Sequence, residues 1–346
     1  MNRGKLVLAA LLICSVSVGL ARAAQKNNYQ VTILKSNEAE DNTVGDPDPL
    51  LKNSWGIAAS PMGPWWVANN GTGTSTLYTG DGEKRPLEVM VPGAPTGEVF
   101  YGGSQFLLSD EQPALFMWAS EDGTISGWNG GLGTQAEVAF PESGVGEPGS
   151  NYKGLAIHGD TLYTTDFGEC KVESLDGTFA EFDTGGEFED DTIPAGYCPF
   201  GIQAVGDSIF VTYALKAGDD DLAGQGHGFV REFDTDGNLV AAVADHGQLN
   251  SPWGVAQAPA GFGRFSGCLL VGNFGDGRIN AYCKDEEGEW GYGGRLRSNK
   301  RDLVIDGLWG IGFGNDHSSG PSTTLYFAAG PDDEENGYFG RVDVVQ

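Results

Sequence analysis

The 346-residue chain is 40% hydrophobic and 11% aromatic, which excludes a protein that is disordered throughout. Glycine accounts for 55 residues without a Gly-X-Y period, so a collagen-like fibre is excluded as well. The formal net charge is −28, and a surface this negative repels phosphate groups and anionic lipid, which excludes nucleic acid as a partner.

Residues 1–24 have the pattern of an export signal that is cleaved off. A positive start (Arg3 and Lys5) precedes an apolar stretch and an Ala-Arg-Ala cleavage site at residues 21–23. No later apolar run has the length that a membrane span needs. We therefore expect a secreted or periplasmic protein without membrane insertion, in which residues 25–346 form a single domain.

The rest of the chain contains a β-strand pattern that recurs six times. Each copy has a strand with a glycine between apolar residues, a turn, a second β-rich strand, a polar turn and a third strand. The first strands of the copies begin near Asn53, Pro95, Asn151, Tyr197, Asn250 and Asp306. Their spacing of roughly 40 to 57 residues is typical of four-stranded propeller blades.

The repeat predicts an all-β fold, a six-bladed β-propeller. Residues 29–34 form one more β-rich segment ahead of the first copy. We expect this segment to pair with the last blade, which closes the ring and covers an open sheet edge. Helices should be few, because no segment shows sustained 3.6-residue apolar periodicity. Seven blades or a right-handed β-helix are the alternatives, and the irregular spacing disfavours the helix.

Four cysteines remain once Cys14 leaves with the export signal, an even number that suggests disulfides in an oxidising compartment. Cys268 opens one predicted strand and Cys283 closes the next, with a hairpin turn midway between them. We therefore predict a Cys268–Cys283 disulfide, which leaves Cys170 to pair with Cys198. The alternative is four buried free thiols.

Blade geometry brings two sets of loops to one face of a propeller: those before the inner strands and those after the second strands. The polar residues in these loops are the candidate binding residues: Asn53, Asn69, Glu121, Asp122, Asn151, Asp166, Asn250, Asn273 and Asp306. Such oxygens are the ligands that Ca²⁺ takes, and Glu121, Asp166 and Asp306 are the candidate metal ligands. The alternative is that tight turns favour Asn and Asp for their own geometry.

Aromatic residues stand immediately before four of the motif glycines. They are Trp55, Phe200, Trp253 and Trp309. They would either line the channel mouth as a stacking platform for a sugar or another flat ligand, or pack between neighbouring blades.

Catalytic motifs do not stand out in the sequence. The four histidines form no zinc-binding pattern, and neither a Gly-x-Ser-x-Gly elbow nor a phosphate-binding loop is present. No catalytic residue can therefore be named from the sequence.

Long motifs between residues 48 and 340 match those of a known group of proteins. They include Asn53-Ser-Trp-Gly-Ile-Ala58, Ser120-Glu-Asp-Gly-Thr-Ile-Ser-Gly-Trp128, Leu249-Asn-Ser-Pro-Trp-Gly254 and Ala329-Gly-Pro-Asp-Asp-Glu334. On these motifs the chain resembles a family of exported, functionally uncharacterised β-propellers related to the NHL-repeat group. The resemblance implies the propeller fold and export, and it implies no activity.

Two comparisons bear on catalysis. Members of that family tend to have histidines near the position of Asn336 and just after that of Asp166, and both are absent here. Propeller lactonases of the gluconolactonase type hold a divalent metal with Glu, Asn and Asp, mostly immediately before the inner-strand glycines. Those positions here carry Trp55, Thr96, Lys153, Phe200, Trp253 and Trp309, so the lactonase metal site is not reproduced.

The sequence leaves three functional hypotheses. The first is an exported, monomeric binding or scaffold module with a polar, acidic site for a small molecule, a glycan or a protein. The second is a metal-dependent hydrolase or lyase in which a cation held by the Asn/Asp/Glu ring polarises a carbonyl or activates water. The third is a structural surface or matrix protein.

Overall fold

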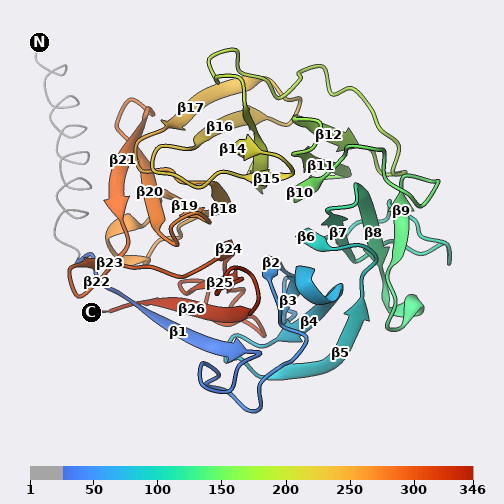
Figure 1. Cartoon of the computed structure of the whole chain (residues 1–346), viewed down its shortest axis with the longest axis horizontal. Coiled ribbons are helices and arrows are strands. Elements are labelled where there is room, and N and C mark those ends of the chain that lie inside the picture. Colours follow the sequence, from blue (N-terminus) through green and yellow to red (C-terminus); the bar gives the residue numbers. More distant parts are fainter. Residues whose placement is uncertain (1–25, 346) are drawn as a thin grey trace, which may run out of the picture.

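A computed structural model describes residues 26–345, so the predicted export signal lies outside the described residues. The chain is an all-β, six-bladed propeller (Figure 1), as predicted. Blade 1 contains β2 (Ser54–Ala59), β3 (Trp65–Asn69), β4 (Thr74–Tyr78) and β5 (Lys84–Met90). Blade 2 contains β6 (Pro95–Phe100), β7 (Phe116–Ser120), β8 (Thr124–Trp128) and β9 (Glu137–Phe140).

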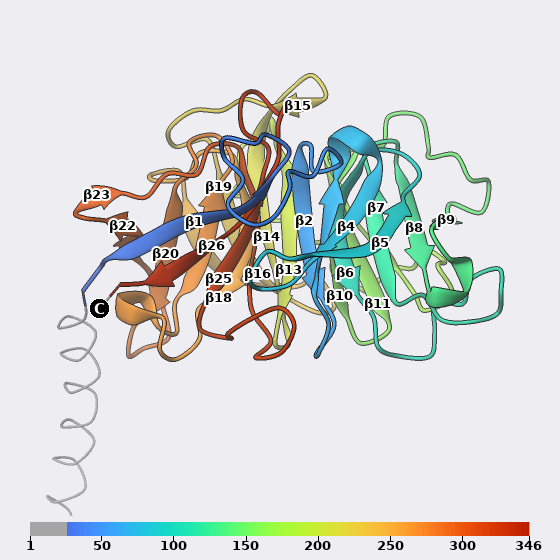
Figure 2. The ribbon, with the colours of Figure 1, turned by 90° about the horizontal axis from the view of Figure 1, so that it is seen from below.

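The next two blades depart from this regular form. Blade 3 contains only β10 (Tyr152–His158), β11 (Thr161–Asp166) and β12 (Lys171–Leu175). Blade 4 contains β13 (Tyr197–Val205), β14 (Ser208–Ala217), β16 (Phe229–Asp234) and β17 (Leu239–Asp245). The short β15 (Asp220–Asp221) pairs with the end of β14 and lies on a loop that stands above one face of the ring (Figure 2).

Blades 5 and 6 complete the ring. Blade 5 contains β18 (Pro252–Gln257), β19 (Leu269–Asn273), β20 (Ile279–Lys284) and β21 (Trp290–Arg295). Blade 6 contains β24 (Leu308–Phe313), β25 (Leu325–Ala329), β26 (Tyr338–Val344) and, from the other end of the chain, β1 (Tyr29–Ser36). Between them lies a small hairpin of β22 (Arg297–Ser298) and β23 (Arg301–Asp302).

The N-terminal strand closes the ring as the sequence predicted. β1 pairs antiparallel with β26, from Tyr29 opposite Val344 to Ser36 opposite Tyr338. This pairing covers the outer edge of β26, which would otherwise offer free backbone groups to another chain. It also joins the two ends of the described chain, so the ring cannot open without breaking this ladder.

The repeated glycine of each inner strand has a packing role. A Cβ atom at Gly201 would lie well inside contact distance of the Trp253 carbonyl oxygen on the next inner strand. A Cβ atom at Gly254 would meet the Trp309 carbonyl oxygen in the same way, and one at Gly310 would meet that of Trp55. Only a residue without a side chain lets neighbouring inner strands approach this closely. The glycines that revealed the repeat in the sequence are therefore the positions at which neighbouring blades make their closest contact around the axis.

The hydrophobic core is divided among the interfaces between neighbouring blades. Phe210 of blade 4, for example, is clustered with Val255 and Val271 of blade 5. All three are at most 4% exposed. Because each interface buries the apolar face of two sheets, the propeller is stabilised as a closed series of sheet-on-sheet contacts.

Both predicted disulfides are present. The Cys268–Cys283 bond lies within blade 5, where it joins the start of β19 to β20. The Cys170–Cys198 bond joins the start of β12 to β13, and so links blade 3 to blade 4. Two disulfides are compatible with an extracellular protein. Within residues 26–345, no helix is long and apolar enough to cross a bilayer.

Replacing Cys268 and Cys283 by alanine is expected to lower the free energy of unfolding by about 3 kcal/mol, because the bond closes a loop of 15 residues in the unfolded chain. Urea unfolding of the oxidised protein and of the variant would measure the difference. A reductant should bring the two midpoints together. Equal midpoints before reduction would contradict the prediction.

Candidate functional site

The inner strands all begin at the face where the second strands end. Ser54 at the start of β2 is paired with Asn69 at the end of β3, and Tyr152 on β10 is paired with Asp166 on β11. We call this the upper face. It is the face above which the β15 loop stands (Figure 2), and it carries the loops that the sequence singled out.

The four aromatic residues predicted at the mouth meet on the propeller axis. The rings of Trp55 and Trp309 are stacked 3.6 Å apart, and Trp253 lies edge-on to both. Phe200 packs on Trp309, and none of the four is more than 8% exposed. They therefore do not form an open stacking platform. Trp309 of blade 6 packs on Trp55 and Trp253 of the two neighbouring blades, close to the axis. Residues that precede the inner-strand glycines all point to the axis, and large rings fill that narrow space.

Two axial positions are not aromatic, and one of them holds a buried cation. Thr96 donates to the Tyr152 carbonyl oxygen at 2.8 Å. The Lys153 side chain is 1% exposed, and its Nζ lies 5.2 Å from the centre of the Trp55 ring. Lys153 Nζ is 2.5 Å from Glu121 Oε1 and 3.2 Å from Asp220 Oδ1. The ammonium thus lies between carboxylates from two upper loops and the four buried aromatic rings, Trp55, Phe200, Trp253 and Trp309. We call these four rings the aromatic plug.

Two further carboxyl groups interact with this ion pair through their charge. Burial raises the pKa of Asp221, and the adjacent Asp220 carboxylate adds to the effect. Burial, reinforced by the Glu121 carboxylate, raises the pKa of Glu334 to about 7. Burial alone would lower the pKa of Lys153, but Glu121 and Asp220 outweigh it and the pKa is raised, so the ammonium stays charged. We call Glu121, Lys153, Asp220, Asp221 and Glu334 the axial cluster.

The loop that carries Glu334 has an unusual backbone. Asp332, Asp333 and Glu334 have φ values of 56°, 53° and 68°, in the left-handed region that residues with a side chain rarely adopt. Asn336 supports this loop by donating to the Asp332 carboxylate at 2.9 Å. Strained loops of this kind concentrate at binding and catalytic sites.

The asparagines predicted as binding residues hold the upper turns. Asn53 accepts from Trp55 Nε1 at 2.8 Å, and Asn69 donates to two threonines of β4. Asn250 accepts from the Gly224 backbone at 2.6 Å, and Asn273 donates to the Gln248 carbonyl oxygen at 2.9 Å. In the structure, these four side chains are bonded to neighbouring strand and loop residues of the upper face.

The remaining predicted residues have separate partners. Asp122 accepts from Thr124 at 2.7 Å, and Asp306 accepts from the Asp332 backbone at 3.1 Å. Asp166 accepts from the Asn151 backbone at 2.9 Å, and the Asn151 side chain donates to the Asp219 carbonyl oxygen at 3.1 Å. Glu121 is the one predicted residue that the structure brings into the axial cluster.

The predicted metal ligands do not form one site. Glu121 faces Lys153, while Asp166 and Asp306 are bonded to backbone groups of different loops. In the described part of the chain, no three His, Cys, Asp or Glu side chains gather closely enough to hold a metal ion. The lysine ammonium takes the place between Glu121 and Asp220 that a cation would need.

The lower end of the axis has different chemistry. The far ends of the inner strands line a cavity of about 520 Å³, with Ile57, Ile157, Val255 and Ile311 among its walls. Glu98 also lines it, and burial raises the pKa of this carboxyl well above its ordinary value. The lower end is therefore largely apolar, whereas the upper end is acidic.

Sequence comparison finds relatives that are uncharacterised proteins of a mimivirus. The chain is 33% identical over 300 residues to the uncharacterised protein R648 of Acanthamoeba polyphaga mimivirus, which covers 82% of this chain and 73% of that protein. It is 32% identical to the uncharacterised mimivirus protein L690, over 85% of this chain and 81% of the relative. The chain belongs to the same family as these mimivirus proteins. No protein-family model matches it.

Solved structures support the fold of this family member. Virginiamycin B lyase from Staphylococcus aureus aligns with a TM-score of 0.52 at 12% identity, over 92% of this chain and all of the enzyme. A protein of unknown function from Bacteroides thetaiotaomicron aligns with a TM-score of 0.53 at 14% identity, over 92% of this chain and 76% of that protein. At these identities the likeness shows the propeller fold alone.

Sequence reasoning missed four of the five residues in the axial cluster. The sequence alone indicated no site role for the acidic runs Asp219–Asp221 and Asp332–Glu335, and it singled out Lys153 only as a departure from the lactonase pattern. Two signals were available. Both acidic runs follow second strands, as Glu121 does, and Lys153 is the one charged residue among the six that precede the inner-strand glycines.

Proposed function

We propose that the protein is an exported binding module, a single domain of residues 25–346, which takes a positively charged ligand group at its upper face. A primary amine or a guanidinium is the group that fits. The observation that carries the proposal is the axial cluster, in which Glu121 and Asp220 contact one buried ammonium and the charges of Asp221 and Glu334 interact with the same pair. The excess of negative charge leaves room for a second cation.

The arrangement of the cluster favours binding at this place. The buried aromatic plug packs against Lys153, so we expect a ligand to approach from the upper side. Lys153 engages one oxygen of Glu121 and one of Asp220, and the Asp220 side chain is 79% exposed. Asp221 and Glu334 form no ion pair with Lys153, and Glu334 in particular is the carboxyl that we expect a ligand to engage. The net charge of −28 adds a long-range attraction that speeds the approach of cations.

Calorimetric titration at pH 8 tests the proposal with Nα-acetylated argininamide, in which the guanidinium is the one charge, and with its neutral analogue, Nα-acetylated citrullinamide. The protein should bind acetylated argininamide and not acetylated citrullinamide. The double variant Asp221→Asn/Glu334→Gln should bind it at least tenfold more weakly, which corresponds to about 1.4 kcal/mol. The control Glu286→Gln/Glu287→Gln removes two charges from the β20–β21 turn, and its affinity should stay within twofold. Equal losses in both variants would show that only the overall field attracts the cation, and would overturn the proposal.

Binding should also depend on pH, since Glu334 has a pKa of about 7. Below pH 7 its carboxyl is protonated and neutral, and above pH 7 it gains the charge that attracts a cation. Affinity for acetylated argininamide should therefore rise roughly fivefold between pH 6 and pH 8, the effect of one partly screened charge worth about 1 kcal/mol. The rise should disappear in Glu334→Gln, and a rise that persists there would assign it to another group.

The raised pKa of Glu334 also determines whether the free energy of unfolding rises or falls with pH. Glu334 binds its proton more tightly in the folded chain than at its ordinary value of 4.5. Its contribution to stability is therefore fully present below pH 4.5 and is lost as the pH rises through 7. A bound cation offsets this loss, because it favours the ionised carboxylate.

The hydrolase or lyase hypothesis receives no support from the residues on the upper face. It needs Glu121, Asp166 and Asp306 around one cation, and each of them has other partners. The likeness to virginiamycin B lyase shows the fold and does not assign its reaction.

A further inference from the structure

Blade 3 lacks the outer strand that every other blade has. Its sheet ends at β12, and residues 176–196 run as a loop from there to β13 (Figure 1). In the other five blades a fourth strand pairs with the third. The outer edge of β12 is therefore an open sheet edge, the kind of edge to which another strand can add.

Residues 181 and 182 of this loop pair with β12 as a fourth strand would, and the loop then turns away from β12. The Phe182 N–H donates to the Ser174 carbonyl oxygen at 3.1 Å, and Leu175 forms an isolated antiparallel bridge with Glu181. In an antiparallel ladder, residues two apart direct their backbone groups to the same side. The N–H and C=O groups of Val172 therefore point to the open edge, as the Ser174 carbonyl does, beyond the point where the loop departs.

Contacts with blade 4 hold the loop away from β12. The Gly186 N–H donates to the Asp236 carbonyl oxygen at 2.7 Å, and the Phe188 N–H donates to that of Gly237 at 3.1 Å. The Phe188 ring is 4% exposed and packs in the cluster between blades 3 and 4. Because the loop is anchored at this distance, a cavity of about 480 Å³ remains between it and β12.

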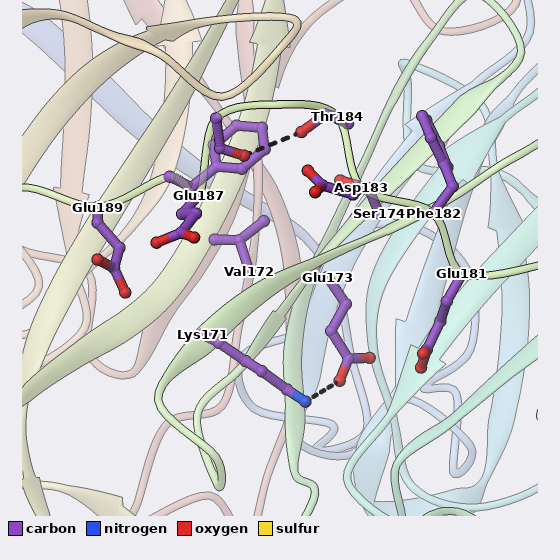
Figure 3. A pocket seen from close by; sticks show the side chains of 12 residues that line it. Lys171, Val172, Glu173, Ser174, Glu181, Phe182, Asp183, Thr184, Glu187 and Glu189 are labelled. Atoms are coloured by element: carbon purple, nitrogen blue, oxygen red, sulfur yellow. Dashed lines mark hydrogen bonds and ion pairs between the residues drawn. The ribbon is translucent and has the colours of Figure 1, made fainter.

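The walls of this cavity are acidic. Its acidic residues, shown in Figure 3, are Glu173, Glu181, Asp183, Glu187 and Glu189. The only basic residue in the wall is Lys171, and its Nζ is already 2.8 Å from Glu173. Phe182 adds an exposed ring at one end, with 40% of its surface accessible. We call this space, between β12 and residues 181–189, the blade 3 groove.

We propose that the blade 3 groove takes an extended basic peptide segment of a partner protein, which pairs with β12 as the fourth strand of the blade. The backbone groups of Val172 supply the ladder bonds, and the carboxylates of the loop recognise lysine or arginine side chains. A second copy of this chain is disfavoured as the occupant, because its net charge of −28 opposes the acidic walls. The site is separate from the axial cluster, so either proposal can be wrong without affecting the other.

Fluorescence anisotropy with a labelled, alternating lysine–valine heptapeptide tests the inference. The control peptide has the same sequence with every backbone nitrogen methylated, so it keeps the charge and loses all its ladder donors. The first peptide should bind and the second should bind at least tenfold more weakly. Equal binding of the two would show that charge alone holds the peptide, and would overturn strand pairing.

Variants locate the binding. Glu181→Gln/Asp183→Asn/Glu187→Gln should weaken binding at least tenfold. The control Glu286→Gln/Glu287→Gln/Glu289→Gln, which removes three charges from the β20–β21 turn, should leave it within twofold. In the Asp221→Asn/Glu334→Gln background, which removes the amine site proposed above, the preference for the unmethylated peptide should persist, which separates this site from the axial cluster. Val172→Pro removes the open N–H and should abolish the preference for the unmethylated peptide.

Hydrogen exchange on the unmodified protein avoids any dependence on the folding of the Val172→Pro variant. The Val172 amide should exchange fast in the free protein and at least tenfold more slowly with the peptide bound. Glu173, whose amide faces β11, should be slow in both states. An unprotected Val172 amide in the complex would overturn the proposal. Protection without peptide, together with a dimer by light scattering, would assign the edge to a second copy and overturn it as well.

Discussion

Replacing Glu121 by glutamine and Asp220 by asparagine in one chain is expected to lower the free energy of unfolding by about 3 kcal/mol. The two substitutions leave the Lys153 ammonium, which is 1% exposed, without the carboxylates that lie 2.5 Å and 3.2 Å from it. A buried charge that loses its partners is strongly destabilising, since it can neither be solvated nor easily paired again. Urea unfolding at pH 6 measures the loss, because Glu334 is then mostly protonated and cannot substitute for them.

A third substitution identifies the cause. Lys153→Met keeps an unbranched side chain on the Trp55 ring, one atom shorter than lysine, and removes the charge, so the triple variant should recover most of the lost stability. If Glu121 and Asp220 act by holding loops instead, the triple variant should stay as unstable as the double one. The cycle thus separates the pairing of a buried charge from a general effect on the upper loops.

The fold could be predicted from the sequence because the residues that repeat along the chain are the ones that pack neighbouring blades together. Each inner strand needs a glycine where it meets the next one, so the glycines recur at blade spacing and mark each blade along the chain. The closing strand was predictable for a similar reason. Residues 29–34 alternate in a β-rich pattern and have no neighbour in sequence to pair with, and the last blade offers the free edge.

The candidate site was less predictable, because it depends on contacts between distant blades. Lys153 meets Glu121 across 32 residues and Asp220 across 67, and no local pattern links them. The predicted loops were of the right class, since Glu121, Asp220 and Glu334 all follow second strands. Which acidic residues turn toward the axis depends on how each loop folds back. That in turn depends on tertiary features such as the left-handed backbone at Asp332 and the pairing of β15 with β14.

Gly201→Ala should be among the most destabilising single substitutions in the ring, at about 3 kcal/mol. The added methyl group would meet the Trp253 carbonyl oxygen and the Thr212 hydroxyl, and a backbone carbonyl in a strand cannot turn aside. Overpacking of this kind forces the two blades apart and typically costs about 1 to 3 kcal/mol. The matched control is Gly130→Ala, where nothing lies within 4 Å of the new atom, and its stability should stay within about 0.5 kcal/mol.

The size of the loss should follow the neighbour that each new methyl group meets. Gly97→Ala, which faces the Leu155 backbone nitrogen, and Gly310→Ala, which faces the Trp55 carbonyl oxygen, should be as costly as Gly201→Ala. Gly154→Ala should cost less, because its nearest neighbour is the Thr165 hydroxyl, a side chain that can rotate away. Thermal unfolding of the four variants ranks them directly. Equal, small losses at all four positions would mean that the inner strands have room to spare, and the repeated glycine would then need another explanation than close packing of the blades.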